Sequence, residues 1–83
     1  MSYEKVTQFR SELAIGTKQT LKAIKHGTAS EVFIADDADW QITQKVEYLA
    51  HESGVPCHRV DSKRKLGVAC GIDVGASAVA VKQ

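Results

Sequence analysis

The fold is decided by residues 31–54, EVFIADDADWQITQKVEYLAHESG. The apolar run 31–35 predicts a buried strand, and the acidic run 36–39 predicts a polar turn. A helix is then expected over 40–53, ended by Gly54, because apolar residues recur on one helical face. Those residues are Ile42, Val46, Leu49 and Ala50. This strand–turn–helix unit is typical of an α/β protein.

The same alternation extends in both directions along the chain. The other expected elements are a helix over 2–10 capped by Ser2, a strand over 13–16, a helix over 17–26 closed by Gly27, a strand over 56–60, a helix over 62–70 stopped at Gly71, and a strand over 76–81 buried on both faces. The order predicts a three-layer α/β/α sandwich with a small four-stranded mixed sheet. Because helical crossovers join parallel strands, we expect most neighbouring pairs to be parallel.

Length and composition limit the class of protein. The 83 residues suit one domain spanning 1–83, and a hydrophobic content of 43% is enough for a core. The net charge of +1 does not by itself indicate a nucleic-acid partner. No apolar run approaches the roughly 20 residues needed to cross a bilayer, and the N-terminus lacks signal-peptide features, so we expect a cytoplasmic protein. Cys57 and Cys70 lack paired metal-ligand spacing and are expected to be buried thiols.

The positive charges lie where a helix dipole disfavours them. Lys18 falls in the first turn of one expected helix, and Lys63-Arg64-Lys65 opens another. An anionic ligand would compensate, since helix N–H groups and cationic side chains together bind phosphate. Lys18, Lys22 and Lys25 also share one stripe of their helix. The alternative is that these lysines are ordinary solvated surface.

A loop between two glycines carries apolar residues. Ile72 and Val74 lie in Gly71–Gly75, and loops usually run over the surface. They are either exposed contacts or minor core residues beneath the last strand. If they are exposed, a cationic ridge beside an apolar loop is suited to binding a folded RNA. The cations would contact the phosphate backbone, and the apolar loop would pack against bases splayed from the stack.

Catalytic motifs are absent from the sequence. It contains no dinucleotide or phosphate-binding glycine loop, no zinc-protease motif and no nucleophile elbow, so no enzyme activity and no cofactor are expected. Asp36, Asp37 and Asp39 are interpreted as helix-capping residues, with a cation site as the alternative. The small residues of 67–71 are expected to let a helix approach the sheet closely.

Four motifs appear in the order seen in one family. They are Gly16-Thr17-Lys18-Gln19-Thr20-Leu21-Lys22-Ala23, Ala35-Asp36-Asp37-Ala38-Asp39, Val60-Asp61-Ser62-Lys63-Arg64-Lys65-Leu66-Gly67 and Ala69-Cys70-Gly71-Ile72-Asp73-Val74. Over essentially its whole length the chain resembles the kink-turn-binding ribosomal proteins (the L-seven-Ae and L-thirty-e family), most of all their short bacterial members from Bacillus-type organisms. The resemblance implies an α/β/α sandwich that binds a kink-turn, an RNA loop with a three-nucleotide bulge followed by tandem sheared G·A pairs.

The resemblance also implies residue roles. The start of the second helix would enter the major groove at the G·A pairs, a role that falls on Gly16, Thr17, Lys18, Gln19 and Lys22. Lys63, with the adjacent Arg64, would hold backbone near the bulge, and Asp39 aligns with an acidic residue that receives a flipped-out base. Ile72, Asp73 and Val74 match the loop that packs against the bulged nucleotides.

Two departures bear on specificity. Lys18-Gln19 stands where many archaeal and eukaryotic members have Asn-Glu, and Trp40 replaces the usual proline after the acidic position. Trp40 is expected to pack as a helix-start staple, with stacking on a base as the alternative. The expected partner is a kink-turn in ribosomal RNA or a riboswitch-type RNA, with the ribosome as a further partner, bound by a monomer. The alternative function is a ribosome-associated protein-interaction module with weak or no kink-turn specificity.

Overall fold

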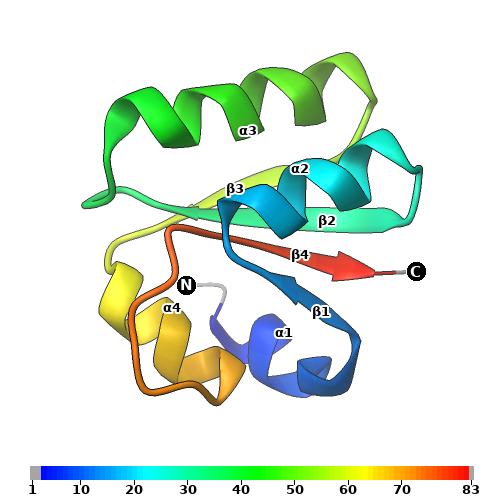
Figure 1. The fold of residues 1–83 in the computed structure, drawn as a ribbon. Helices are drawn as coiled ribbons and strands as arrows, with labels where there is room; N and C mark the ends of the chain where they lie inside the picture. The colour runs from blue at the N-terminus through cyan, green and yellow to red at the C-terminus, as the bar shows by residue number, and fades with distance from the viewer. Residues whose placement is uncertain (1–2, 83) are drawn as a thin grey trace.

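The computed structural model describes residues 3–82, which form helices packed on both faces of one sheet (Figure 1). The helices are α1 (Tyr3–Gln8), the short 3-10 helix η1 (Arg10–Glu12), α2 (Thr17–Lys25), α3 (Trp40–Glu52) and α4 (Lys63–Cys70). The strands are β1 (Leu13–Ile15), β2 (Ala29–Ala35), β3 (Cys57–Val60) and β4 (Ala78–Lys82). The predicted three-layer sandwich is confirmed, and the predicted cap Ser2 lies outside the described residues.

The sheet is mixed, with strand order β1-β4-β2-β3. Only β2 and β3 pair in parallel, whereas β4 runs antiparallel to both β1 and β2. The prediction that most neighbours are parallel was therefore wrong. The helical connections do keep β1, β2 and β3 pointing the same way, but the last strand enters between β1 and β2 from the opposite direction.

Each face of the sheet has its own core. Val32 and Ile34 of β2 pack with α2 and α3, while Phe33 and Ala35 pack with α1 and α4. The alternation follows from the two-residue period of a strand, and β4 repeats it with alanines on one face and valines on the other. The central strands are therefore buried on both faces, as predicted for β4.

Helix α3 buries most of the predicted stripe: Val46 and Ala50 are buried and Leu49 packs against the core, which confirms those three positions. Its buried residues are Thr43, Val46 and Ala50, whereas Ile42 is 38% exposed. The prediction for Ile42 was wrong because the buried stripe begins one residue later. Thr43 can be buried since its hydroxyl donates to the carbonyl of Trp40 at 3.4 Å.

No helix within residues 3–82 has the length and hydropathy to cross a bilayer.

Both cysteines are free thiols. Cys70 is buried and Cys57 is half-buried. Burial raises the pKa of each thiol to about 11, so both stay protonated near neutral pH. This agrees with the prediction of structural thiols, except that Cys57 keeps some contact with solvent.

Candidate nucleic-acid interface

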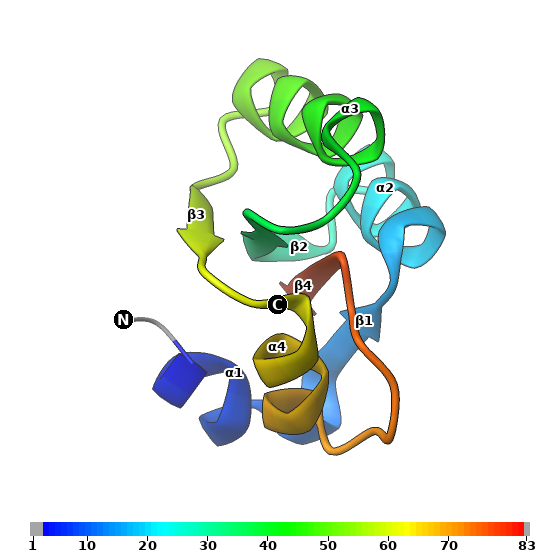
Figure 2. The same cartoon turned by 90° about the vertical axis from the view of Figure 1, so that its left-hand side faces the viewer.

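Strand direction brings four segments to one edge of the sheet. The C-terminal ends of β1, β2 and β3 and the N-terminal end of β4 all meet there, as Figure 2 shows. We call the surface formed by residues 16–19, 36–39, 62–65 and 71–77 the strand-end surface. It contains every predicted site residue except Lys22, which lies one turn further along α2.

Backbone hydrogen bonds tie these segments together. The Gly16 amide donates to the carbonyl of Ala78 at 2.9 Å, and the Ala35 amide donates to that of Ser77 at 3.0 Å. The Ala76 amide donates to the carbonyl of Lys63 at 2.9 Å. The start of α2, the end of β2, the start of α4 and the 71–77 loop therefore hold one another in position.

The start of α2 is open to a ligand. Gly16 precedes the helix with φ +99°, a conformation that favours glycine, and no side chain caps this end. A Cβ on Gly16 would meet no atom of the described residues within 4 Å, so there is open space beside this glycine. The first-turn N–H groups, which have no intrahelical acceptors, can therefore reach an anionic or polar partner from outside.

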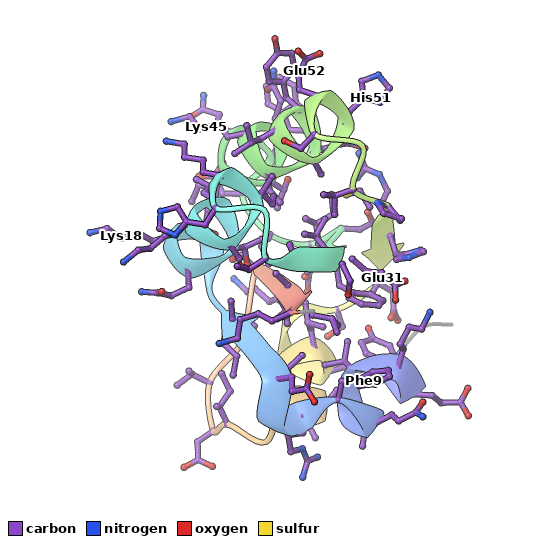
Figure 3. The ribbon with its side chains drawn as sticks, turned by 90° about the vertical axis from the view of Figure 1, so that its right-hand side faces the viewer. Phe9, Lys18, Glu31, Lys45, His51 and Glu52 are labelled. Carbon is purple, nitrogen blue, oxygen red and sulfur yellow. The ribbon has the colours of Figure 1, made fainter. Side chains whose placement is uncertain are left out.

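The cations predicted on α2 lie on its outer side. Thr20, Ala23 and Ile24 hold the helix against the sheet, while Lys18 and Lys22 are exposed, and Figure 3 shows Lys18 pointing away from the molecule. Gln19, between them, is also exposed.

These lysines have no acidic partner within residues 3–82. Lys5 and Lys65, by contrast, pair with Glu31 at 2.9 Å and Asp61 at 3.6 Å. The α2 lysines thus present uncompensated positive charge.

The start of α4 differs from the prediction. The Ser62 hydroxyl accepts from the Lys65 amide at 3.1 Å, and the Asp37 carboxylate accepts from the Lys63 amide at 2.8 Å. Because protein oxygens already cap this helix, its N-terminus does not provide the vacant N–H groups that the charge pattern suggested. Among the described residues, Lys65 pairs with Asp61 at 3.6 Å, whereas the side chains of Lys63 and Arg64 form no ion pair. The start of α4 is therefore capped but still cationic, while the start of α2 has no side-chain cap among the described residues.

The three aspartates of the 36–39 turn have separate partners. Asp39 caps α3, its carboxylate accepting from the Gln41 amide at 2.9 Å, which confirms the capping interpretation. Asp37 caps α4 instead, and Asp36 pairs with Arg59 at 3.1 Å. No group of three or more potential metal ligands occurs among the described residues. The cap made by Asp37 and the ion pair of Asp36 could not be found from sequence, because their partners lie more than twenty positions away.

The 71–77 loop is packed tightly onto α4. A Cβ at Gly67 would lie only 2.0 Å from the carbonyl oxygen of Val74, and one at Gly75 would lie 3.3 Å from the Lys63 side chain. The prediction was that the small residues of this helix allow it to approach the sheet closely. At Gly67, the missing side chain instead allows the 71–77 loop to pack closely on α4. The two apolar loop residues differ: Val74 is 69% exposed, whereas Ile72 is half-buried against the core beneath α4.

Trp40 and Arg64 also lie differently from expectation. Trp40 is 66% exposed beside Asp39, so it does not pack as the predicted staple. The side chain of Arg64 lines a groove between α1 and α4 together with Thr7 and Val68, away from the α2 lysines. The structure thus brings Lys18, Gln19 and Val74 to one surface and leaves Arg64 at its margin.

Comparisons with known proteins identify the family. The model of the ribosomal protein L7Ae/L30e/S12e/Gadd45 family matches residues 2–83. A protein of Geobacillus kaustophilus named as an RNA-binding protein is 56% identical over 81 residues, which is 98% of each chain. Another with that description, from Halalkalibacterium halodurans, is 54% identical over the full length of both chains.

A solved structure supports the same relationship. The Giardia lamblia 15.5 kDa RNA-binding protein superposes with a TM-score of 0.89 at 30% identity, covering 94% of this chain and 68% of the other. Both the sequence and the fold therefore lead to one conclusion: the chain belongs to the ribosomal protein L7Ae/L30e/S12e/Gadd45 family.

Proposed function

We propose that this chain binds structured RNA and recognises the kink-turn, with residues 1–83 acting as a single RNA-binding domain. The observation that carries the proposal is the start of α2, which no described side chain caps and which carries exposed Lys18, Gln19 and Lys22. This helix begins at the same end of the sheet as the loop that carries exposed Val74. The relatives named as RNA-binding proteins match almost the whole chain and support the RNA-binding part of the proposal.

Helix α2 reads the tandem G·A pairs in this proposal. Gly16 and Thr17 allow the backbone to approach the bases closely, since no side chain fills the space in front of Gly16. Lys18 and Gln19 carry N–H donors suited to guanine O6 and N7, the acceptors that guanine shows in its major groove edge. Lys22, one turn on, neutralises a neighbouring phosphate.

The other segments hold the bulge. Lys63 binds backbone phosphate through its exposed side chain, and its main chain is fixed by Asp37 and Ala76. Val74 covers the apolar face of a splayed base, next to Asp73 in the same loop. Asp39 uses one carboxylate oxygen as a helix cap and keeps the other for a flipped-out base.

The protein performs no chemistry in this role. It binds the kinked form of the RNA more tightly than the extended form and so shifts the population toward the kink. The differential affinity comes from contacts that exist only when the bulge and the G·A pairs lie on the strand-end surface together.

A binding titration tests the proposal against the alternative of a protein-interaction module. The wild-type protein is titrated with a kink-turn RNA and with a matched duplex whose tandem G·A pairs are replaced by Watson–Crick pairs, each at several salt concentrations. Selective binding that weakens steeply with salt is expected, because phosphate contacts release counterions. Equal or absent binding to both RNAs would refute the proposal and favour protein partners on the ribosome.

A further inference from the structure

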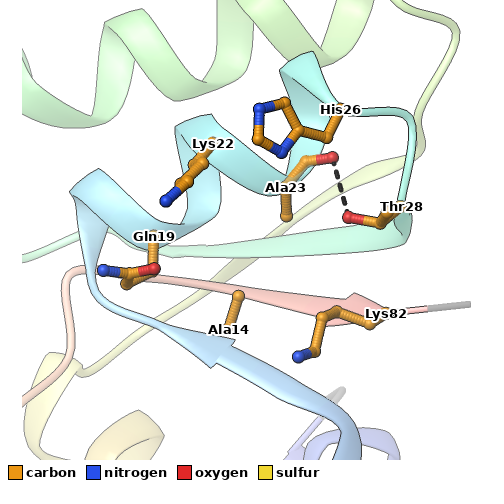
Figure 4. A pocket seen from close by; sticks show the side chains of 7 residues that line it. All are labelled: Ala14, Gln19, Lys22, Ala23, His26, Thr28 and Lys82. Carbon is orange, nitrogen blue, oxygen red and sulfur yellow. Dashed lines mark hydrogen bonds between the residues drawn. The ribbon is translucent and has the colours of Figure 1, made fainter.

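A polar pocket runs along the flank of α2 next to the strand-end surface, with which it shares Gln19. It has a volume of about 160 Å³, space for several water molecules or one phosphate group. Its lining is Ala14, Gln19, Lys22, Ala23, His26, Thr28 and Lys82 (Figure 4). We call it the α2 flank pocket.

The lining has the chemistry of an anion site. Two alanines, Ala14 and Ala23, contribute only methyl groups and leave room between the longer side chains. Around them stand the ammonium groups of Lys22 and Lys82 and the ring of His26, and no carboxylate of residues 3–82 lines the pocket. Within residues 3–82 neither lysine forms an ion pair, whereas Lys5, Arg59 and Lys65 do.

Three separate segments build this pocket: β1 through Ala14, residues 19–28 through α2 and the turn after it, and β4 through Lys82. Lys82 ends β4, where it pairs with Ala29 across the sheet. Thr28 follows α2 and donates its hydroxyl to the Ala23 carbonyl at 3.2 Å. His26 comes from the C-terminal end of α2. The sequence separates Lys82 from His26 by more than fifty residues, so only the sheet topology brings their side chains to one pocket.

The pocket continues the proposed RNA surface. Gln19 and Lys22 line both, and from Gln19 the helix extends roughly 10 Å to His26 at 1.5 Å per residue. A nucleic-acid strand held at Lys18 and followed along α2 therefore passes directly over the pocket. A small metabolite would have to compete with this strand for the same Lys22.

We propose that the α2 flank pocket binds a backbone phosphate of the RNA stem that leads away from the kink, with Lys82 and His26 as its outer ligands. This inference rests on the proposed function and extends it: the footprint of the protein reaches beyond the kink, and affinity depends on the length of one stem. The contact is to backbone only, so it is independent of the stem's sequence.

The test uses Lys82→Ala, with His26→Ala as a second variant, against kink-turn RNAs in which each stem is shortened in turn. Lys5→Ala is the matched control, because it removes the same charge from an exposed site on the opposite face of the sheet. The melting temperature of each variant is measured to show that the fold is retained.

On the RNA with full stems, Lys82→Ala should bind more weakly than the wild type. On the RNA in which one particular stem is shortened, the two proteins should bind equally well. One lost phosphate contact should also make the slope of log K against log salt shallower by about 0.9. When the salt concentration is raised from about 50 to 200 mM, the affinity of both proteins falls. The fold-loss for the variant should then be roughly 3.5 times smaller than the fold-loss for the wild type.

Two results would overturn the inference while leaving kink-turn recognition intact. One is that Lys82→Ala binds the full-length RNA as the Lys5→Ala control does. The other is that Lys82→Ala loses the same affinity on every shortened RNA. The lost charge would then act through long-range electrostatics and not through a contact with one stem. Failure of the wild type to prefer the kink-turn over the Watson–Crick duplex would instead remove the proposed function, and this inference with it.

Discussion

Replacing Gly67 by alanine tests how the binding loop is held on α4. An added Cβ would lie 2.0 Å from the carbonyl oxygen of Val74 and 3.2 Å from the Cα of Gly75, both main-chain atoms. Ordinary contacts of this kind are about 3.5 Å, so the loop must move by more than about 1 Å. It cannot swing aside cheaply, because the Ile72 amide donates to the Gly67 carbonyl at 3.1 Å and the Ala76 amide to that of Lys63 at 2.9 Å.

The magnitude follows from two opposing effects. Overpacking of this kind costs about 1–3 kcal/mol, and the rigid main-chain obstacle favours the upper end. Alanine regains about 1 kcal/mol of helix propensity relative to glycine. The net loss of unfolding free energy is therefore about 2 kcal/mol, which lowers the melting temperature of a domain of this size by roughly 8–16 °C.

The assay is thermal unfolding followed by circular dichroism, together with RNA binding at a temperature where the variant is fully folded. RNA binding should fall as well, because the displaced loop carries Val74. Val68→Ala is the control: Val68 is the next residue of α4 and 63% exposed, so its replacement should leave both readings nearly unchanged. An unchanged or higher melting temperature for Gly67→Ala would refute the close contact between helix and loop.

Three further predictions concern surface and core. Lys22→Ala should weaken RNA binding while changing unfolding free energy by less than about 0.5 kcal/mol, since its side chain is exposed; a loss of stability typical of a core change would contradict its role in binding. Val74→Asp should impair binding with little effect on melting, whereas Ile72→Asp should lower both, because Ile72 packs on the core; equal melting of the two variants would argue against this difference. Acid should destabilise the protein through Glu31: burial opposes its ionisation, but Lys5 and His58 outweigh this and lower its pKa below the usual 4.5. The resulting stabilisation is present above pH 4.5 and is lost as the pH falls through the folded-state pKa. The free energy of unfolding of Glu31→Gln, measured with denaturant, should therefore depend less on pH in that range than that of the wild type. An unchanged pH dependence would exclude this cause.

Local patterns predicted the elements of this fold well. The apolar run of β2 and the glycines that follow α2, α3 and α4 all mark boundaries close to the observed ones. These signals are local, because strand burial, helix periodicity and left-handed helix ends depend on neighbouring residues alone. The direction of β4 is not local. Nothing in its alternating alanines and valines distinguishes an antiparallel neighbour from a parallel one.

The site was predictable to a similar extent. Helical periodicity indicated Lys18, Lys22 and Lys25 correctly as an exposed cationic stripe, because it separates them from Leu21 and Ile24 on the inner side. Gln19 came only from the family resemblance. It misjudged the start of α4, because the compensating Asp37 comes from a loop twenty-six residues earlier.

Two further features of the site needed the fold. Periodicity does not distinguish Ile72 from Val74, so sequence could not tell which of them is exposed. It also gave no indication of Lys82, whose charge reaches the α2 flank pocket only through the pairing of β4 in the sheet.

Stabilisation of a kinked RNA by the strand-end surface is measured most directly by energy transfer between dyes on the two stem ends of a kink-turn RNA during titration with the protein. We expect a rise in transfer on binding and no rise for the duplex with Watson–Crick pairs in place of the G·A pairs. With Lys22→Ala, the same rise should require more protein. Binding without any rise in transfer, or the same rise for both RNAs, would contradict the proposed stabilisation.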